Sequence, residues 1–363
     1  MTKKIIFSTG GTGGHVLPAI NLMKHFHLKG YSVLLVTDNR GSNFLRNYPE
    51  FKFYVLKTDT PTKKNYLRKL ISLCTIFFSI IRSILILKKE KPNLVFGFGG
   101  YVSFPISFAS KFFNLPLFIY ENNMILGKTN NFLLGISKKI FTAHEINKKI
   151  PEKFKNKIFQ VGPILTKDII NSSKSIKKEK KSITTISVFG GSQGAEIFGK
   201  IVPPVIKMLK DEGHKIEINQ QCFKGQKNQI MDYYEQNKIN NNVFEFNKNI
   251  SEIMLSTDLA ISRCGASTTA ELVYTATPFI AVPLPTSIDN HQYINAKHYE
   301  SKGCCWLLEE KNFNTKNLFN LIKQLIHDKK KFQNICTSIK KNHFMNAYEN
   351  IDKKITEFIK NEN

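Results

Sequence analysis

Arginine and acidic side chains are scarce in this sequence of 363 residues. Only five arginines occur, and 53 Lys and Arg residues stand against 28 Asp and Glu residues, so the formal net charge is +25. The chain has neither an arginine-rich cluster nor a recognisable nucleic-acid motif, which argues against nucleic acid as a partner. A surface this positive still attracts anionic lipid, although the lysine- and asparagine-rich bias is also what AT-rich coding produces.

Cysteine patterns that hold metals are missing as well. None of the six cysteines forms a C-x-x-C pair or has histidines at the spacing of a zinc site. Isolated thiols in a reducing compartment are therefore the expected state. Only the residues MTKK precede the first apolar stretch, so we expect no signal peptide and a protein that stays in the cytoplasm.

An uninterrupted apolar run long enough to span a bilayer is also lacking. In the segment 65–91, residues Leu70–Ile81 are almost wholly apolar, but Arg82 falls within the roughly 20 residues that a spanning helix needs. Three interpretations stay open: a buried helix that crosses between strands, a helix in the membrane interface with its lysines on lipid phosphates, and a spanning helix. The first two are compatible if one face packs inward and the other contacts lipid.

The sequence does contain a regular alternation of short apolar runs and helical patterns. This alternation predicts the α/β class, with two doubly wound, Rossmann-like domains whose parallel sheets are covered on both faces. In the first half we expect strands at Ile5–Ser8, Ser32–Thr37, Lys52–Leu56, Asn93–Phe96, Leu117–Tyr120, Lys139–Thr142 and Ile158–Val161. In the second half we expect them within ITTISVFGG and at Lys215–Asn219, Val243–Phe246, Leu259–Ser262, Phe279–Val282 and Cys305–Leu308.

The polar stretch TKDIINSSKSIKKEKKS, residues 166 to 182, is the best candidate for a domain boundary. After it the run ITTISVFGG starts the cycle of strand, glycine loop and helix again. We therefore expect one domain over residues 1–163 and a second over residues 164–342. The last segment, residues 343–363, has helical spacing of the apolar residues Ile351, Ile355, Phe358 and Ile359.

The stretch IIFSTGGTGGHVLPAI, residues 5 to 20, places four glycines between an apolar run and a helical pattern. A strand, a glycine loop and a helix in this order present free backbone N–H groups at the positive helix end, which favours an anionic or polar ligand. Two alternatives remain. The spacing gives no G-x-G-x-x-G dinucleotide motif, although Asp38 follows the second strand as a ribose-binding acid would. The loop can also be a tight turn that binds no ligand.

Two further glycine clusters follow expected strands, GFGGYVS at 97–103 and GGSQGA at 190–195. In an open parallel sheet, ligands bind outside the carboxyl ends of the strands. Because the three glycine clusters come from both domains, they indicate a site in a cleft between the domains.

The segments SRCGASTTAEL (262–272) and DNHQYINA (289–296) add polar side chains at the starts of two expected helices. The hydroxyl side chains at 267 to 269 can cap the first helix and donate to phosphate oxygens. The carboxylate of Glu271 suits the two hydroxyls of a ribose, since it accepts two hydrogen bonds. The second segment contributes three polar residues: His291, Gln292 and Asn295.

Six segments together resemble one family of bacterial enzymes. In the family's order they are GGTGGHVLPA, GFGGYVSFP, ENNMILGKTN, GGSQGA, SRCGASTTAEL and DNHQYINA, and they run from residue 10 to residue 296. Any one of them is a weak signal, but the set is highly specific. The chain is similar to the family of glycosyltransferases that make lipid II in peptidoglycan synthesis.

The resemblance implies the GT-B fold, in which the N-terminal domain binds the lipid acceptor, the C-terminal domain binds UDP-N-acetylglucosamine, and the final helix crosses back. The implied reaction moves N-acetylglucosamine to the muramyl sugar of a polyprenyl-pyrophosphate acceptor, lipid I, with inversion at the anomeric carbon. No metal and no cofactor are implied, in line with the lack of a D-x-D motif. The implied location is the cytoplasmic face of the inner membrane, where a peripheral protein would contact anionic lipid through its basic surface and the 65–91 segment.

His15 is the candidate general base, since imidazole, with an ordinary pKa of about 6.5, can take the proton of the acceptor hydroxyl near neutral pH. The alternative is that His15 orients the loop or binds the acceptor without moving a proton. The resemblance assigns substrate contacts to Thr12, Gly13, Gly14, Asn123, Ser192, Ala266, Ser267, Thr268, Thr269, Ala270, Glu271 and Gln292. No residue is assigned to a metal.

Two stretches depart from the family pattern. Thr166 stands where the family usually has an arginine suited to diphosphate charge, and the neighbouring Lys167 cannot copy a bidentate guanidinium. The stretch that contacts uracil reads FNKNI from Phe246, with Asn247 in place of an isoleucine. Both departures leave the donor affinity open.

Three other functions fit parts of the sequence. A related transferase that moves a hexose to diacylglycerol or another lipid shares the glycine clusters and the Glu271 region. A UDP-sugar epimerase shares the two-domain architecture but needs no lipid contact. A non-catalytic membrane scaffold fits the basic charge, yet it has no use for a nucleotide site.

Overall fold

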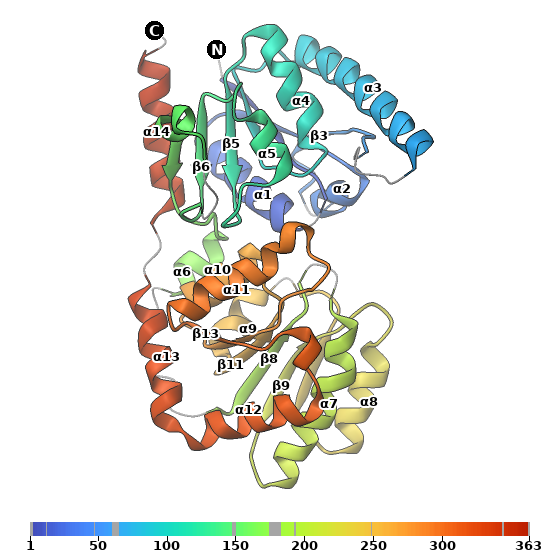
Figure 1. Cartoon of the computed structure of the whole chain (residues 1–363), viewed down its shortest axis with the longest axis vertical. Helices are drawn as coiled ribbons and strands as arrows, with labels where there is room; N and C mark the ends of the chain where they lie inside the picture. The colour runs from blue at the N-terminus through green and yellow to red at the C-terminus, as the bar shows by residue number, and fades with distance from the viewer. Residues whose placement is uncertain are drawn as a thin grey trace. The chain divides into compact units, whose positions relative to one another are not determined.

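The structure is a computed structural model that describes residues 3–11, 13–46, 48–59, 65–146, 150–173, 183–191, 194–247, 249–342 and 345–361. The chain divides into two compact units (Figure 1). The first consists of Met1–Ile164 together with Met345–Asn363, and the second of Leu165–Phe344. Each unit is built on its own parallel sheet, so the predicted α/β class with two doubly wound domains is confirmed.

The first unit has a seven-stranded sheet in the order β3-β2-β1-β4-β5-β6-β7. Its strands are β1 (Lys4–Ser8), β2 (Ser32–Thr37), β3 (Lys52–Val55), β4 (Leu94–Gly97), β5 (Leu117–Glu121), β6 (Lys139–Thr142) and β7 (Ile158–Gln160). Its helices are α1 (Gly13–Leu28), α2 (Asn39–Leu45), α3 (Tyr66–Glu90), α4 (Ser103–Ala109), α5 (Lys128–Leu133) and α14 (Ala347–Asn361), with the 3-10 helices η1 (Ser110–Phe113) and η2 (Glu152–Lys157). The strand order reverses between β1 and β4, so a ligand is expected at their carboxyl ends.

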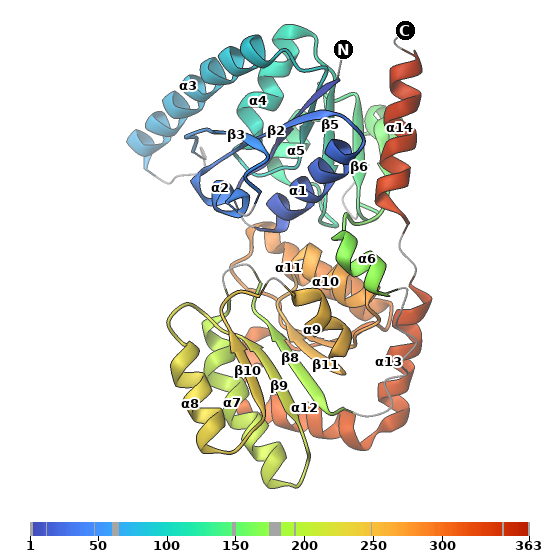
Figure 2. The ribbon, with the colours of Figure 1, turned by 180° about the vertical axis from the view of Figure 1, so that it is seen from behind.

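The second unit has a six-stranded sheet in the order β10-β9-β8-β11-β12-β13 (Figure 2). Its strands are β8 (Thr185–Phe189), β9 (Glu217–Gln221), β10 (Asn241–Phe244), β11 (Leu259–Ser262), β12 (Phe279–Ala281) and β13 (Cys305–Leu307). Its helices are α6 (Lys167–Ser173), α7 (Glu196–Asp211), α8 (Lys227–Gln236), α9 (Ile250–Ser256), α10 (Ala266–Tyr274), α11 (His291–Ser301), α12 (Thr315–His327) and α13 (Lys329–Lys341), with η3 (Ile288–Asn290) and η4 (Glu310–Asn312). Here the order reverses between β8 and β11.

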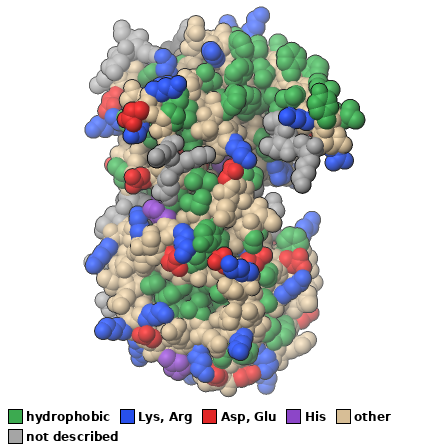
Figure 3. Space-filling view, in the orientation of Figure 1, with side chains coloured by type: hydrophobic (Ala, Val, Ile, Leu, Met, Phe, Trp, Pro, Cys, Tyr) green, Lys and Arg blue, Asp and Glu red, His purple; other side chains and the backbone are tan. Residues whose placement is uncertain are grey.

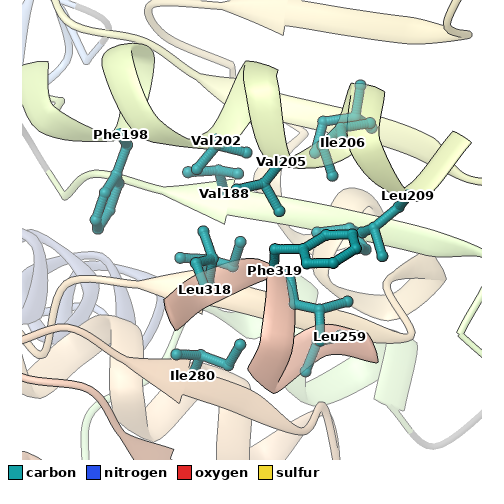
Figure 4. Close-up of a cluster of buried hydrophobic side chains, with 14 of the residues drawn as sticks. Val188, Phe198, Val202, Val205, Ile206, Leu209, Leu259, Ile280, Leu318 and Phe319 are labelled. Carbon is teal, nitrogen blue, oxygen red and sulfur yellow. The ribbon is translucent and has the colours of Figure 1, made fainter. Parts of the chain in front are cut away.

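The core of the second unit shows how helix and sheet hold one another. Buried apolar residues recur along α7 at helical spacing: Phe198, Val202, Val205, Ile206 and Leu209. Figure 4 shows this stripe facing Val188 of β8, with Leu318 and Phe319 of α12 completing the cluster. A stripe of this width fixes one face of a helix on a sheet and leaves the other in water.

Most strands lie within one residue of their predicted bounds, but two predictions are wrong by two residues. The strand predicted at Lys215–Asn219 is β9, and the one predicted at Val243–Phe246 is β10. Both begin or end with polar residues. Gln220 is fully buried in β9, where its Oε1 accepts a hydrogen bond from the Tyr234 hydroxyl at 2.5 Å. A buried amide satisfied by a distant side chain carries no apolar signal in the sequence.

Helix α14 crosses back to the first unit, as the resemblance implied. Asp352 accepts a hydrogen bond from Nε2 of His25 at 2.9 Å, and it also pairs with Lys29. Burial opposes the charge of Asp352, yet the hydrogen bonds from His25 and Lys29 lower its pKa. The ring of Phe358 lies edge-on to Phe118 of β5, with their centroids 5.1 Å apart.

Helix α3 has its polarity reversed relative to an ordinary surface helix. Its buried residues are Ser72, Ser79, Ser83, Ile86, Leu87 and Glu90. The exposed apolar ones are Leu67, Leu70, Ile71, Leu73, Phe77, Phe78, Ile81 and Leu85. Ser72 donates to the Asp59 carboxylate at 2.8 Å, and Ser79 donates to the carbonyl of Lys57. The serines therefore fasten the polar face to the unit and leave the apolar face outside.

Glu90 anchors the C-terminal end of α3. Its carboxylate accepts hydrogen bonds from Lys52 Nζ at 2.6 Å, from the Tyr54 hydroxyl and from Lys4 Nζ at 3.1 Å. Burial opposes the charge, but these three donors lower the pKa of Glu90 to about 2. The end of α3 is thereby tied to β1 and β3.

In the described part of the chain, α3 is the one helix long and apolar enough to cross a bilayer, by length and composition alone. Only 28% of its most apolar window is buried, so this crossing helix is covered on one face only. The helix does cross between β3 and β4, with one face on the unit. Hydrophobic side chains gather over α3 and α4 in the space-filling view (Figure 3).

Candidate functional site

The loops that follow β1 and β4 touch each other through glycines. A Cβ atom added to Gly100 would lie 2.7 Å from the carbonyl oxygen of Gly10, and Gly100 has a φ of +76°. A Cβ added to Gly10 would in turn overlap the side chain of Val102. The two predicted glycine clusters therefore form one continuous backbone surface at the switch point of the first sheet.

His15 lies on this surface. It is half-buried in the first turn of α1, after Gly13 and Gly14. A Cβ added to Gly99 would lie 3.5 Å from Cε1 of His15 and 3.3 Å from Nδ2 of Asn130, so the missing side chain leaves room for the imidazole. Thr12 lies outside the described residues, and its assignment stays a prediction.

Pro18 leaves one carbonyl in the first turn of α1 without its usual helical donor. A residue at this place would normally donate its N–H to the carbonyl of Gly14, but proline has no N–H. The side chain of Asn122 supplies the missing donor, with Nδ2 at 3.3 Å from the Gly14 oxygen. The segment ENN at the end of β5 is thus bonded directly to the first glycine loop, a contact that sequence reasoning missed.

Glu121 organises the rest of that segment. Its side chain is almost wholly buried, and Oε1 accepts hydrogen bonds from the backbone N and from Nδ2 of Asn123, at 3.0 and 3.1 Å. Oε2 accepts from the backbone N of Gly127 and from Nδ2 of Asn130, both at 2.9 Å. Both nitrogens of Asn123 donate to Glu121, so its Oδ1 and the second N–H of its amide are left to contact a substrate.

Asp38 holds the first glycine loop from the other side. Its carboxylate accepts from the backbone N of Gly41 at 2.7 Å, capping α2, and from the backbone N of Gly11 at 3.3 Å. The hydroxyl of Tyr101 donates to the same carboxylate at 3.1 Å and accepts from Arg40 at 2.8 Å. The carboxylate of Asp38 thus holds the first glycine loop, a structural role that its position in the sequence did not predict.

In the second unit, α10 begins at the carboxyl end of β11. The first turn of a helix has backbone N–H groups that donate no bond within the helix, and here these include the amides of Ala266 and Thr268. The hydroxyl of Thr269 donates to the carbonyls of Gly265 and Ala266, at 3.0 and 3.2 Å. Thr269 and Ala270 are fully buried, so any contribution of these two residues to binding is indirect.

Gln292 joins two loops beside this helix. Its Oε1 accepts from the backbone N of Cys264 at 3.1 Å and of Leu284 at 3.0 Å. The oxygen is thereby occupied, and Nε2 is the atom able to donate to a ligand. Asn295, one turn further on, donates to the carbonyl of Cys264 at 3.0 Å and supports the same loop.

Glu271 is a half-buried carboxyl in the second turn of α10. Burial raises its pKa to about 7, so a fraction of the side chain carries a proton at neutral pH. A ligand that donates hydrogen bonds to this carboxylate would favour its charged form.

The glycine cluster after β8 is held by a side chain that sequence reasoning missed. Gln221 accepts from the backbone N of Gly190 at 3.0 Å and donates to the carbonyl of Gly191 at 2.9 Å. Gln221 is the last residue of the polar strand β9, and no sequence pattern at this position predicts a bond to the glycine loop. Ser192 lies outside the described residues, so its assignment also stays a prediction.

The two departures from the family pattern have local structural roles. The hydroxyl of Thr166 accepts from the backbone N of Ile169 at 3.4 Å, at the start of α6. Asn247 Oδ1 accepts from the backbone N of Asn249 at 2.8 Å, and the neighbouring Phe246 is 68% exposed. Within the described residues, no group of three or more His, Cys, Asp or Glu side chains has the arrangement of a metal site.

Two family models match the chain. The glycosyltransferase family 28 N-terminal domain matches residues 5–142, and the glycosyltransferase family 28 C-terminal domain matches residues 185–351.

Curated relatives match over nearly the whole chain. One is the UDP-N-acetylglucosamine--N-acetylmuramyl-(pentapeptide) pyrophosphoryl-undecaprenol N-acetylglucosamine transferase of Pelagibacter ubique, 37% identical over 100% of both chains. The protein of the same name from Rickettsia felis is 37% identical over 90% of this chain and 92% of its own.

Solved structures share the fold. Acinetobacter baumannii MurG covers 98% of this chain and 100% of its own, with a TM-score of 0.76 and 22% identity. A UDP-GlcNAc 2-epimerase from Neisseria meningitidis bound to UDP-GlcNAc covers 98% of this chain and 100% of its own, with a TM-score of 0.66 and 14% identity. At these identities the similarity concerns the two-domain GT-B architecture alone.

Replacing Glu121 by Gln should loosen the segment after β5. The amide can accept with one oxygen only, so its NH2 group must face either the donors at Asn123 or those at Gly127 and Asn130. We expect the free energy of unfolding to fall by about 1–3 kcal/mol, with faster hydrogen exchange at the Asn123 and Gly127 amides. Glu145→Gln, at an exposed position, is the matched control. Unchanged exchange at both amides in Glu121→Gln would contradict the assigned role.

Proposed function

The chain belongs to glycosyltransferase family 28, and we infer from this premise that it is a hexosyltransferase of peptidoglycan synthesis. It transfers N-acetylglucosamine from UDP-N-acetylglucosamine to the muramyl sugar of undecaprenyl-pyrophosphoryl-MurNAc-pentapeptide (lipid I), which gives lipid II. The observation that carries this function is the similarity, over the whole of both chains, to the Pelagibacter ubique transferase at 37% identity.

The second unit binds the donor in this proposal. The backbone amides of Ala266 and Thr268 lie at the positive end of α10 and suit the diphosphate. The carboxylate of Glu271, one turn further, accepts from the ribose hydroxyls. Gln292 donates from Nε2 to the sugar, because its oxygen already holds two backbone N–H groups.

The first unit binds the acceptor and supplies the base. The acceptor oxygen bonds to the anomeric carbon as the bond from that carbon to the diphosphate oxygen breaks, so the configuration inverts and UDP leaves. The acceptor hydroxyl proton passes to the imidazole of His15 during this step. The position of His15 at the switch point, with Gly99 leaving it space, supports the assignment. Gly13 and Gly14 let the sugar diphosphate of the donor and the headgroup of the acceptor approach the backbone closely.

Replacing His15 by Ala should reduce kcat for transfer of labelled N-acetylglucosamine to a soluble lipid I analogue by roughly 10²–10⁴-fold. The assay contains EDTA, and wild-type activity should persist because the proposed step uses no metal. His27→Ala, an exposed histidine on the same helix, is the matched control and should keep full activity.

Transfer retained in the His15 variant would leave the enzyme assignment intact and remove His15 from the proton step. A folded wild-type protein without transfer to lipid I, but with transfer to diacylglycerol, would favour the lipid hexosyltransferase alternative.

Donor binding should strengthen as the pH rises. Ribose hydroxyls donate to the charged form of Glu271, so binding of UDP must displace the proton that burial keeps on this group at low pH. With a pKa of about 7, affinity for UDP should increase about tenfold between about pH 6 and pH 8. Calorimetry should record proton release at pH 6 in wild type. Glu271→Gln should remove the pH dependence, whereas Glu300→Gln in the same unit should keep it. If the affinity of the wild-type protein for UDP does not change over this pH range, the proposed role of Glu271 is wrong.

We also propose that the enzyme is a peripheral protein at the cytoplasmic face of the inner membrane, attached through α3. Eight exposed apolar side chains on one helix form a patch of the kind that marks membrane contacts. Exposed basic residues lie near both ends of the helix, among them Arg68, Lys69, Lys88, Lys89 and Lys91. Because serines and Glu90 bind the other face to the unit, the helix lies along the lipid surface and does not span it.

Charge reversal of Lys88, Lys89 and Lys91 to Glu should weaken binding to anionic vesicles by roughly 100-fold or more, since each lysine near the surface contributes about 1 kcal/mol. Co-sedimentation at low salt measures this. The same charge change at Lys316, Lys329 and Lys330, which are exposed on the second unit, is the control and should have a smaller effect. Equal vesicle binding by wild type and the first triple variant would count against α3 as the attachment site.

A further inference from the structure

Four phenylalanines form a row on the surface of the first unit, which we call the aromatic ladder: Phe132, Phe104, Phe108 and Phe112. Ring centroids are 5.5 Å apart between Phe132 and Phe104, 5.5 Å between Phe104 and Phe108, and 5.8 Å between Phe108 and Phe112. Phe132 is 71% exposed and Phe112 is 62% exposed. The two inner rings pack against the core along one edge and are open along the other.

The two ends of the ladder lie at different parts of the unit. Phe104 is the second residue of α4, which begins just after the glycine loop of β4. Phe132 belongs to α5, which follows the segment organised by Glu121. The other end is Phe112 in η1, and both α4 and η1 pack against α3. The ladder thus runs from the glycine loop that follows β4 to η1 beside α3, about 12 Å along α4 and η1 at 1.5 Å per residue.

The charge near the Phe132 end of the aromatic ladder suits an amphiphilic ligand. Lys128 lies one helical turn before Phe132, so the two side chains share a face of α5. A cation followed by a row of exposed aromatic rings complements a ligand with an anionic head and a long apolar chain. A polyprenyl diphosphate has this order of groups.

Bulk lipid and a second protein fit less well than the acceptor's own chain. A bilayer contact requires only the Phe112 end, which lies in η1 beside α3. Phe132 and Phe104 lie beside the loops where the acceptor headgroup must bind for the reaction, so bilayer lipid there would exclude the substrate. A row one ring wide is also narrow for a stable protein interface, which buries about 800 Å² on each partner.

We propose that the aromatic ladder binds the first isoprene units of the acceptor's own lipid chain and leads that chain from the glycine loops toward the bilayer. The proposal rests on the proposed function, since it presumes a polyprenyl acceptor. It makes the ladder a determinant of lipid-chain specificity that is separate from membrane attachment.

The test compares two soluble lipid I analogues, one with a short and one with a long isoprenoid chain, below the concentrations at which they aggregate and without vesicles. Wild type should have a lower KM for the long chain. Phe132→Ser should raise KM for both analogues by about 5–20-fold, because both chains reach this ring. Phe112→Ser should raise KM for the long-chain analogue alone. In both variants kcat should stay unchanged, since the contact is equal in the ground state and transition state.

Phe78→Ser on α3 is the matched control, since Phe78 is equally exposed, at 67%, but lies outside the ladder. It should weaken vesicle binding and leave both KM values unchanged. All three substitutions replace exposed rings, so circular dichroism should show an intact fold.

Equal KM values for the two analogues in wild type, or ladder variants that behave like Phe78→Ser, would overturn the proposal while the transferase function stands. Wild type that transfers to neither analogue would instead refute the proposed function. The two failures are therefore distinguishable.

Discussion

In the first unit, the arrangement of the candidate site depends on the hydrogen bonds that the buried carboxylate of Glu121 accepts. An ionised carboxyl is strongly destabilising in an apolar interior unless hydrogen bonds replace its water. Here four N–H groups from Asn123, Gly127 and Asn130 do so, and no cation takes part in these bonds. Opening the segment would expose or unpair the charge. The loop is therefore held in one conformation, and Asn122 transmits that order to the turn that carries His15.

In the second unit, neutral side-chain amides hold the loops of the candidate site in a similar way. Gln221 bonds the glycine loop after β8, and Gln292 bonds the loops that follow β11 and β12. Neutral side chains fix the backbone without filling the site with charge. The positive ends of helices then remain available for a diphosphate. In both units the residues that hold the loops differ from those that face the ligand.

The sequence allowed a good prediction of the strands because most are continuous apolar runs, such as Ser32–Thr37 and Leu259–Ser262. It failed at β9, where Gln220 is satisfied by Tyr234 through tertiary contact. The glycine motifs predicted where the loops lie, but they did not predict the side chains that hold those loops in place. Asn122 binds Gly14, which is 108 residues away, and no local pattern encodes such a pair. Asp38 was noticed for its position, while its partners at Gly11 and Tyr101 became visible only in three dimensions.

Because the exposed face of α3 is apolar, the net charge of +25 also affects how copies of the protein interact with one another. A protein that displays a row of leucines and phenylalanines in water should stick to its own copies whenever no bilayer covers them. Molecules of high like charge repel one another, and this repulsion keeps the apolar faces apart. Concentrated salt, commonly added to keep basic proteins in solution, shortens the Debye length to about 3 Å at 1 M and removes that protection. The lysines thus keep the molecules apart in solution, in addition to the lipid contact proposed for them.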